Sequence, residues 1–395
     1  INVRAIAQGA SERNISIIID ETNAKRALNA LHESFFEKDL KDIHIFITGV
    51  GNVGGYLIQQ IKNQKDFISK NLGLNLKVLG VSNSKKMLIS KEEIDLKNWS
   101  ELLDNSKTKA DKDLFQKTII ELNRRNSLFI DNTASDIIPL TYNDYLKNGV
   151  GIITCNKISN SGTLNVYKEL RELSRIHNAP FYYETNVGAA LPVISTLKNL
   201  INSGDKVLKI EAVLSGTLNY IFNNFQEENT FHDIVSKAVK LGYTEPDPKI
   251  DLCGIDVCRK ILILARESGF NLEYEDVKKN HFLPDESINT SSNDEFILSL
   301  KNNKAHFNKI LNEAKEKNCR LKFVAKLDNG NASVGLEAVS ADHPFYNLVG
   351  SDNITVFHTE RYKDSPLVVK GAGAGGEFTA SGVFADIIKA SQENG

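Results

Sequence analysis

The sequence contains few of the residues that mark several classes of protein. Its 395 residues include four cysteines, eight prolines, one methionine and one tryptophan. The cysteines form no CxxC pair, so neither a disulfide framework nor a zinc site is indicated, and they are best explained as small buried side chains. They are Cys155, Cys253, Cys258 and Cys319. This usage predicts a reducing, cytoplasmic location.

Long apolar runs and an excess of one charge are also missing. No run approaches the roughly 18 apolar residues of a membrane span, and no secretory signal is visible. The net charge of -2 includes no basic excess of the kind that favours nucleic acid or a membrane surface. We therefore expect no nucleic-acid or membrane partner, and a small molecule as the ligand.

The arrangement of predicted elements changes along the chain. At 395 residues the chain is long for a single core. Residues 1–38 read as strand, turn, strand and a helix over about 22–35, which is half of a small α/β module. Residues 43–185 alternate strand and helix, which predicts a Rossmann-type doubly wound parallel sheet. From about residue 190 the pattern predicts an α+β domain with a mostly antiparallel sheet, followed by a final helix over 377–390. The chain opens at Ile1 inside a strand-like run, so we expect a fragment of a longer polypeptide.

A glycine-rich turn is the first chemical signal. Gly49-Val-Gly-Asn-Val-Gly54 follows a strand at residues 43–47, and a helix starts near Val53. Glycines in this context allow a tight turn and let a pyrophosphate approach the free N–H groups at the helix start. Dinucleotide binding is the favoured interpretation, and a purely structural turn is the alternative.

The second strand of this domain bears on the choice of cofactor. It ends in Val81-Ser-Asn-Ser-Lys-Lys86, where an NAD-specific site usually has an acidic residue for the ribose 2′-hydroxyl. Asn83 lies beside Lys85 and Lys86, which could accept a 2′-phosphate. NADP is therefore favoured and NAD stays possible. The alternative for the lysines is a solvated turn.

Two further strand ends should meet at the ligand crevice of the sheet. They are Asp131-Asn-Thr133 and Thr154-Cys-Asn-Lys157. Lys157 is either a surface lysine or a site residue.

Residues 242–260 form the second chemical signal. Four carboxylates and Tyr243 gather in a loop stiffened by Pro246 and Pro248, which we expect to be non-helical up to about residue 250. The carboxylates are Glu245, Asp247, Asp251 and Asp256. A helix follows, on which Asp256 and Lys260 are one turn apart. One interpretation is an ordinary exposed ion pair, which contributes roughly 0.2–0.5 kcal/mol. The acidic loop instead favours a site that binds a substrate amine and moves a proton.

Taken together, these motifs resemble the homoserine dehydrogenase family over nearly all of residues 43–392. The motifs that carry the resemblance are the glycine turn, Thr154-Cys-Asn-Lys157, Tyr183-Glu-Thr-Asn-Val-Gly-Ala-Ala-Leu-Pro192, Ser215-Gly-Thr-Leu-Asn-Tyr220 and residues 242–260. Residues 1–38 resemble the end of the regulatory ACT region of bifunctional aspartokinase–homoserine dehydrogenases.

The resemblance implies a division of the chain and partners for it. The parts are a partial ACT remnant (1–38), an NADP-binding Rossmann domain (39–185), a catalytic and dimerisation domain (186–360) and a segment returning to the nucleotide-binding domain (361–395). A homodimer is implied, with kinase and ACT regions in the same parent polypeptide.

The resemblance also implies roles for single residues. The implied activity is the NADP-dependent, reversible reduction of L-aspartate 4-semialdehyde to L-homoserine, on the route to threonine and methionine. Lys260 matches the catalytic lysine, and Lys157 a second lysine near the cofactor and the reacting group. The resemblance implies that Glu245 and Asp256 bind the substrate, with Asp251 and Tyr243 in the same pocket. Cofactor contacts fall to Gly49, Gly51, Asn52, Val53, Gly54, Asn83, Thr133, Lys157 and Gly375. The resemblance also implies a monovalent-cation site, with sodium as the expected ion. Its residues are Glu184, Val187, Ala189 and Leu191.

Two other functions stay open at this point. One is a different nicotinamide-dependent dehydrogenase of amino-acid aldehydes or oxo acids. The other is a non-catalytic module that senses the cofactor.

Overall fold

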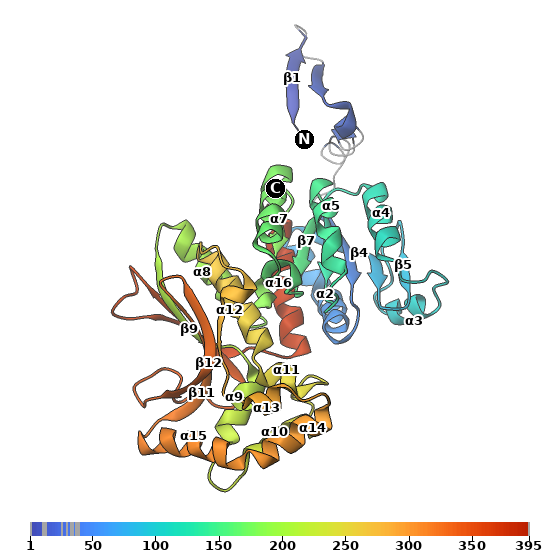
Figure 1. Cartoon of the computed structure of the whole chain (residues 1–395). Helices are drawn as coiled ribbons and strands as arrows, with labels where there is room; N and C mark the ends of the chain where they lie inside the picture. Colours follow the sequence, from blue (N-terminus) through green and yellow to red (C-terminus); the bar gives the residue numbers. More distant parts are fainter. Residues whose placement is uncertain are drawn as a thin grey trace.

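The structure, a computed structural model, describes residues 2–9, 14–24, 27, 28, 31, 35 and 40–393. Its first element is a hairpin of two antiparallel strands, β1 (Val3–Gln8) and β2 (Ile15–Ile19), followed by the short turn η1 (Glu21–Asn23). Figure 1 shows this hairpin standing apart from the two larger sheets. The helix expected over 22–35 falls largely outside the described residues.

A mainly parallel sheet forms the nucleotide-binding part. Its order is β5-β4-β3-β6-β7-β8, and all pairs are parallel except that β5 runs antiparallel at the edge. The strands are β3 (Lys41–Thr48), β4 (Leu74–Ser82), β5 (Met87–Ile89), β6 (Ser127–Asp131), β7 (Gly151–Thr154) and β8 (Phe181–Tyr182). The apolar runs of β3, β4 and β6 are buried, as expected for a parallel sheet with both faces covered. The strand order reverses between β3 and β6, and this is where ligands bind in such sheets.

Helices and short turns connect these strands. They are α2 (Asn52–Leu72), α3 (Trp99–Asp104), α4 (Lys112–Leu122), η2 (Ile138–Thr141), α5 (Tyr142–Lys147), α6 (Ile158–Ser161) and α7 (Leu164–His177). The last helix of the chain, α16 (Gly376–Glu393), packs against α2 (Figure 1). The C-terminus of the chain therefore helps to cover the nucleotide-binding sheet.

The second large sheet is mostly antiparallel. Its order is β10-β12-β11-β9-β13-β14, and only β10 and β12 run parallel. The strands are β9 (Val207–Val213), β10 (Lys278–Asn280), β11 (Arg320–Asp328), β12 (Asn331–Val339), β13 (Asp352–Thr359) and β14 (Leu367–Ala372). Its helices and turns are η3 (Glu184–Asn186), α8 (Val193–Asn202), α9 (Gly216–Asn224), α10 (Phe231–Lys240), α11 (Pro248–Leu252), α12 (Ile255–Glu267), η4 (Tyr274–Asp276), α13 (Asp285–Ile288), α14 (Asn293–Asn302) and α15 (Lys304–Glu316).

One hydrophobic core links the two sheets. Phe129 and Tyr142 of the nucleotide-binding part belong to the same buried cluster as Ile210 and Leu262 of the antiparallel part. Helix α12 contributes most to this cluster, because its residues 260–266 are all buried. The helix that carries Lys260 is therefore a central element of the fold.

Two expectations need correction. The segment expected to return from residue 361 first adds β14 to the antiparallel sheet, and only α16 packs on the nucleotide-binding part. The acidic loop is helical from Pro248, earlier than expected. Proline is favourable at the first position of a helix, and the side chain of Asp247 caps that helix by accepting from Lys249 N. Among the described residues, no helix is long and apolar enough to cross a membrane.

Candidate functional site

The turn between β3 and α2 has the geometry of a phosphate-binding loop. Gly49 has a φ of +88°, and a Cβ there would lie 2.8 Å from the carbonyl carbon of Asn132. A Cβ on Gly54 would lie 2.3 Å from the Gly49 oxygen, whereas a Cβ on Gly51 would meet nothing within 4 Å. The first and third glycines therefore allow close packing, and the second leaves the backbone open to a ligand. No side chain caps the start of α2, so its N–H groups are available for an anion.

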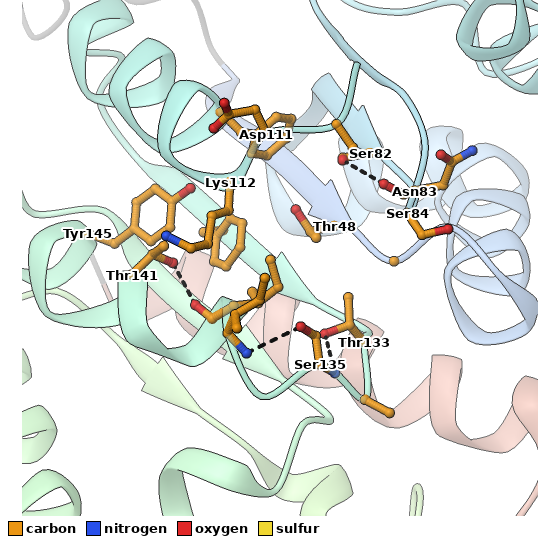
Figure 2. Close-up of a pocket in the computed structure, with 17 residues that line it drawn as sticks. Thr48, Ser82, Asn83, Ser84, Asp111, Lys112, Thr133, Ser135, Thr141 and Tyr145 are labelled. Atoms are coloured by element: carbon orange, nitrogen blue, oxygen red, sulfur yellow. Dashed lines mark hydrogen bonds between the residues drawn. The ribbon is translucent and has the colours of Figure 1, made fainter. Parts of the chain in front are cut away.

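A cavity of about 550 Å³ opens beside this turn, at the carboxyl ends of β3, β4 and β6 (Figure 2). Its walls are largely apolar and aromatic, and Phe115, Phe129 and Tyr145 contribute to them. Its polar lining comes from Thr48, Ser82, Asn83, Ser84, Asp111, Lys112, Thr133, Ser135 and Thr141. Apolar walls with a few polar groups suit a nucleoside. The expected cofactor residues Gly49, Asn83 and Thr133 all line it.

Two further features fit a bound dinucleotide. Both polar atoms of the Asn132 side chain are buried without a hydrogen-bond partner, next to Gly54. Buried amides normally have partners, so Asn132 is an exception beside the glycine turn. The segment containing Gly375 (φ +116°) reaches the glycine turn, because a Cβ on Gly376 would lie 2.7 Å from Asn52 Nδ2. Asn52 and Val53 form the first turn of α2.

In the turn after β4, the side chain of Asn83 forms hydrogen bonds within the turn itself. Asn83 Oδ1 accepts hydrogen bonds from the backbone N–H groups of Lys85 and Lys86, both at 2.8 Å. Lys86 Nζ donates to the Asp104 carbonyl. Of the two lysines expected near the ribose, only Lys85 thus has an ammonium without a partner among the described residues. The Asn83 side chain has only its Nδ2 donor left for a ligand.

Lys260, Asp256 and Lys157 form one cluster of charged side chains. Lys260 Nζ lies 2.8 Å from Asp256 Oδ2, and Lys157 Nζ lies 3.2 Å from Asp256 Oδ1. Lys260 is only 8% exposed and also donates to the Leu214 carbonyl at 2.7 Å. The exposed ion pair considered for Asp256 and Lys260 is therefore wrong for Lys260, which is buried, whereas the side chain of Asp256 is 48% exposed. Lys157 precedes α6, at the carboxyl end of β7, so one carboxylate is shared by lysines from two parts of the fold.

The environment moves the pKa values of these three groups in different directions. Burial alone would raise the pKa of Asp256, but the charges of Lys260 and Lys157 outweigh it and hold that pKa well below the ordinary value. The charge of Asp256 raises the pKa of Lys157. Burial lowers the pKa of Lys260, although the same carboxylate opposes this. Lys260 is the more buried lysine, which makes it the better proton donor.

The acidic loop lies next to this cluster. Asp251 Oδ2 accepts from Glu245 N at 2.8 Å. Burial, with Glu245 and Asp256 nearby, raises the pKa of Asp251 to about 6. Tyr243 is half exposed, its ring meets Tyr220 edge-on at 4.8 Å, and its carbonyl accepts from Thr217 Oγ1. A buried carboxylate with like charges around it is a receptor for a cation such as a substrate ammonium.

The residues expected to hold a monovalent cation are close in the chain and largely buried. Glu184 caps α8, because its two carboxylate oxygens accept from Ile194 N (2.7 Å) and Ser195 N (2.8 Å). Val187 and Ala189 are buried, and Ala189 has a φ of +52°. The Leu191 carbonyl accepts from Val193 N. Thr185 Oγ1 is buried there without a partner. Among the described residues, no cluster of three acidic, histidine or cysteine side chains could hold a metal ion.

Sequence reasoning missed three groups at this site. The Leu214 carbonyl holds Lys260, and a backbone carbonyl leaves no signal in the sequence. Asn353 Nδ2 donates to the same carbonyl at 3.3 Å from the distant strand β13. Thr217 lies in the Ser215-Gly-Thr motif that carried the resemblance, so its role was detectable.

Comparison with known proteins decides the family. The homoserine dehydrogenase family model matches residues 192–388, and the model of the NAD-binding domain of homoserine dehydrogenase matches residues 49–184. Homoserine dehydrogenase of Schizosaccharomyces pombe is 38% identical over 358 residues, which are 88% of this chain and 95% of that protein. The chain belongs to the homoserine dehydrogenase family. The resemblance found in the sequence motifs is confirmed.

Three further comparisons concern the length of the chain, its first residues and its fold. A bifunctional aspartokinase/homoserine dehydrogenase of Zea mays is 43% identical over 98% of this chain but only 43% of its own length, so the chain spans less than half of that relative. An ACT-domain model matches residues 1–35. The solved structure of a hyperthermophilic archaeal homoserine dehydrogenase in complex with NADPH is 26% identical and has a TM-score of 0.69, over 89% of this chain and 98% of that one.

Proposed function

We propose that this chain catalyses the reversible, NADP-dependent reduction of L-aspartate 4-semialdehyde to L-homoserine. The observation that carries the proposal is the charged cluster: Asp256 holds Lys260 and Lys157 next to the acidic loop. The cluster provides a proton donor, and the loop provides a receptor for an amine.

Residues of the nucleotide-binding part hold the cofactor in this proposal. Gly51, Asn52 and Val53 face the pyrophosphate, and Thr133 and Gly375 flank the cofactor beyond it. When bound, the nicotinamide cofactor supplies or accepts hydride. Lys157 lies at the carboxyl end of the sheet, on the same side as the glycine turn, and connects the cofactor site to Asp256.

Lys260 delivers the proton to the aldehyde oxygen. An ammonium has three N–H donors, and those of Lys260 reach Asp256 and the Leu214 carbonyl, which leaves one for the substrate. Reduction needs protonated Lys260, so its rate falls as pH rises through the pKa of that lysine. Oxidation needs neutral Lys260, so its rate rises over the same range. Because burial lowers this pKa, both rates change at a lower pH than they would with an exposed lysine.

The acidic loop binds the α-ammonium of the substrate. Glu245 and Asp251 supply carboxylates, Asp256 supplies a third on the side of the reacting group, and Tyr243 closes the exposed side. Since the pKa of Asp251 is about 6, substrate affinity should weaken as pH falls below 6 and this carboxyl is protonated.

NADP is the favoured cofactor because of the turn after β4. An NAD-specific site offers a carboxylate acceptor to the ribose 2′-hydroxyl. Here Asn83 Oδ1 is already occupied by two backbone N–H groups, so Asn83 Nδ2 and the Lys85 ammonium offer donors, which suit a 2′-phosphate.

A monovalent cation, sodium in the first instance, completes the proposed site. Glu184 would supply the charge, and the carbonyls of Val187, Ala189 and Leu191 the remaining oxygen ligands. Replacing sodium chloride by choline chloride should lower activity, and equal rates in both salts would remove the cation from the proposal.

The division of the chain and its assembly belong to the same proposal. We assign residues 1–38 to an ACT remnant, 39–185 to cofactor binding and 186–360 to catalysis and dimerisation. In the segment 361–395, β14 belongs to the antiparallel sheet and α16 returns to the nucleotide-binding part. The proposed enzyme works as a cytoplasmic homodimer, within a parent polypeptide that also carries kinase and ACT regions. Sedimentation at the mass of a monomer would contradict the dimer.

An assay of NADPH and NADH oxidation with L-aspartate 4-semialdehyde tests the activity. We expect the higher kcat/KM with NADPH. Lys260→Ala should lose about 10²- to 10⁴-fold in kcat, the usual contribution of a general acid, with NADPH binding by fluorescence nearly unchanged. Near-normal turnover of this variant would contradict the role of Lys260.

The same assay separates the two alternatives. Faster turnover of another amino-acid aldehyde or oxo acid would identify a different dehydrogenase. Tight NADPH binding without any turnover would favour a cofactor-sensing module.

A further inference from the structure

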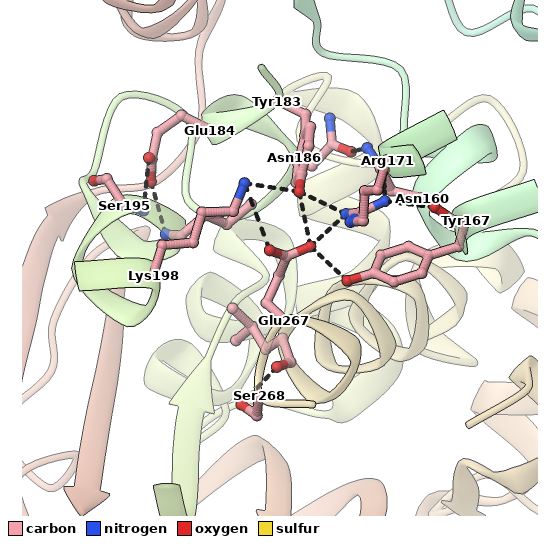
Figure 3. Close-up of polar contacts among 12 residues, drawn as sticks. Asn160, Tyr167, Arg171, Tyr183, Glu184, Asn186, Ser195, Lys198, Glu267 and Ser268 are labelled. Atoms are coloured by element: carbon pink, nitrogen blue, oxygen red, sulfur yellow. Dashed lines mark hydrogen bonds and ion pairs between the residues drawn. The ribbon is translucent and has the colours of Figure 1, made fainter. Parts of the chain in front are cut away.

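A buried ionic cluster surrounds Glu267, at the end of α12 (Figure 3). The side chain of Glu267 is 5% exposed. Its carboxylate accepts from the hydroxyls of Tyr167 and Tyr183, both at 2.8 Å, and from Arg171 Nη2. Lys198 Nζ lies 3.6 Å away. Neither the cofactor nor the proton-transfer roles assigned above use any of these groups.

The partners of Glu267 come from outside the helix that carries it. Tyr167 and Arg171 are on α7, Tyr183 precedes η3, and Lys198 is on α8. Burial alone would raise the pKa of Glu267, but Arg171 and Lys198 outweigh it and keep the pKa low, so the group is ionised. An ionised group so deeply buried is stable only while its partners stay in place. The cluster therefore fixes α12 against α7 and α8.

More polar contacts extend this attachment toward the reaction site. Arg266 Nη1 donates to the Asn160 carbonyl at 3.0 Å, and Arg259 Nη1 donates to Ser161 Oγ at 3.1 Å. Asn160 and Ser161 belong to α6, which begins directly after Lys157. The side of α12 that bears Arg259 and Arg266, seven residues apart, is thus bound to the segment that starts with Lys157.

The contact between Lys157 and Asp256 is the reaction-site end of this attachment. Its 3.2 Å distance joins the nucleotide-binding part to α12. Lys260 and Glu267 are seven residues apart, two turns of one helix, and so lie on the same side of it. A shift of α12 along α7 would change the distance from Lys157 to Asp256 directly, whereas the distance from Asp256 to Lys260, within one helix, would change little.

We propose that Glu267 is a positioning residue that holds Lys157 at the Asp256–Lys260 pair. The inference rests on the proposed function and adds to it. Without the carboxylate charge, Arg171 and Lys198 repel each other, α12 moves relative to α6 and α7, and Lys157 leaves Asp256.

This displacement would change the proton affinity of Lys260. Three charged groups face Lys260: Asp256 on its own helix, Lys157 from α6 and Asp251 from α11. The positive charge of Lys157 disfavours the protonated form of Lys260, and Lys157 also shares its carboxylate. When Lys157 withdraws, Lys260 keeps Asp256 to itself and holds its proton to higher pH.

The test is the pH profile of Glu267→Gln in the NADPH-dependent assay. Glutamine keeps the shape and removes the charge. We expect kcat for reduction to fall about tenfold or more, the typical effect of a small displacement at a reaction site. The alkaline limb of the profile should move to higher pH, and the KM for NADPH should stay nearly unchanged. Tyr167→Phe removes one hydrogen bond to Glu267 and should move the profile less, in the same direction.

Glu211→Gln is the matched control. Glu211 is also a buried glutamate, with its side chain 6% exposed, and it pairs with Lys209 at 2.9 Å and Lys326 at 3.6 Å on the antiparallel sheet. Among the described residues, its ion-pair partners are Lys209, Lys326, His343 and His358, and none of them is on α6 or α7. This variant should lose thermal stability without a shift of the alkaline limb.

Each result has a distinct meaning. An unchanged profile for folded Glu267→Gln would overturn the inference, and so would an equal shift in Glu211→Gln. If Glu267→Gln does not fold, the Tyr167→Phe profile decides in the same way. A wild-type chain without turnover of L-aspartate 4-semialdehyde would instead overturn the proposed function.

Discussion

The glycine turn follows β3 and Lys157 of the charged cluster follows β7, both at the carboxyl ends of strands of one sheet, but the two features are built in opposite ways. The turn is made of backbone within six consecutive residues, and its glycines allow the close packing. The cluster is made of side chains from β7 to α12, about 100 residues apart, and the core around α12 holds it together. Geometry that is local in sequence forms the proposed cofactor site, whereas geometry that depends on the whole fold forms the proposed proton donor.

This contrast predicts that cofactor affinity and proton transfer can be damaged separately. Substitutions in the turn should affect NADPH binding and leave the pH profile unchanged. Substitutions in the charged cluster should change the pH profile and leave NADPH binding unchanged.

Asp256→Asn should produce the largest effect. Both lysines lose their shared carboxylate, so we expect kcat to fall about 100-fold, within the range for a disturbed general acid. Without Asp256, the pKa of Lys260 falls further, because burial and Lys157 both lower it. The alkaline limb of the reductive profile should therefore move to lower pH, the opposite direction from Glu267→Gln.

Asp247→Asn is the control for this variant. Asp247 belongs to the same acidic block, but its side chain caps α11 and accepts from Lys249 N. A small change in activity is expected, and an equal loss in both variants would mean that the total negative charge matters more than Asp256.

Gly54→Ala should have an intermediate effect. Its Cβ would lie 2.3 Å from the Gly49 oxygen, so the turn must shift, at a cost of about 1–3 kcal/mol in stability. We expect NADPH to bind about tenfold more weakly by fluorescence titration, a loss of about 1.4 kcal/mol, with an unchanged pH profile. Gly55→Ala is the matched control, because a Cβ there meets nothing within 4 Å. If Gly55→Ala weakens NADPH binding as much, the close packing of Gly54 is not the cause.

Asn83→Asp should have the smallest effect and change only the choice of cofactor. A carboxylate would accept from a ribose hydroxyl and repel a 2′-phosphate, so the ratio of kcat/KM for NADPH to that for NADH should fall several-fold. Asn98→Asp, on the exposed start of α3, is a control of equal charge. An unchanged ratio in Asn83→Asp would place cofactor discrimination elsewhere, with Lys85 the next residue to test.

The sequence predicted best those parts of the fold that are formed by residues close together in the chain. The strand, glycine turn and helix at residues 43–54 follow from hydrophobic pattern and glycine spacing, and both sheets appear as expected. The pattern after residue 360 was less informative, because β14 is a half-exposed edge strand with a weak signal.

The charged cluster shows what a single sequence cannot give. Spacing places Asp256 and Lys260 one turn apart, but spacing does not distinguish a buried pair from an exposed one. Burial of Lys260 depends on contacts with residues far away, such as the Leu214 carbonyl. The cluster around Glu267 went unnoticed for the same reason, since its partners, from Tyr167 to Lys198, are far from Glu267 in the sequence.

The three charged side chains of the cluster differ in their contact with bulk water. The side chain of Lys260 is 10% exposed, that of Lys157 27% and that of Asp256 48%. Each reductive turnover consumes one proton, so Lys260 must be recharged before the next aldehyde is reduced. The most hydrated neighbour of Lys260 in the cluster is the carboxylate to which it is bound, and a proton from solvent can pass to that carboxylate and from it to the neutral amine, in two transfers. The recharging step therefore needs no channel through the protein interior, and the medium itself acts as the proton reservoir.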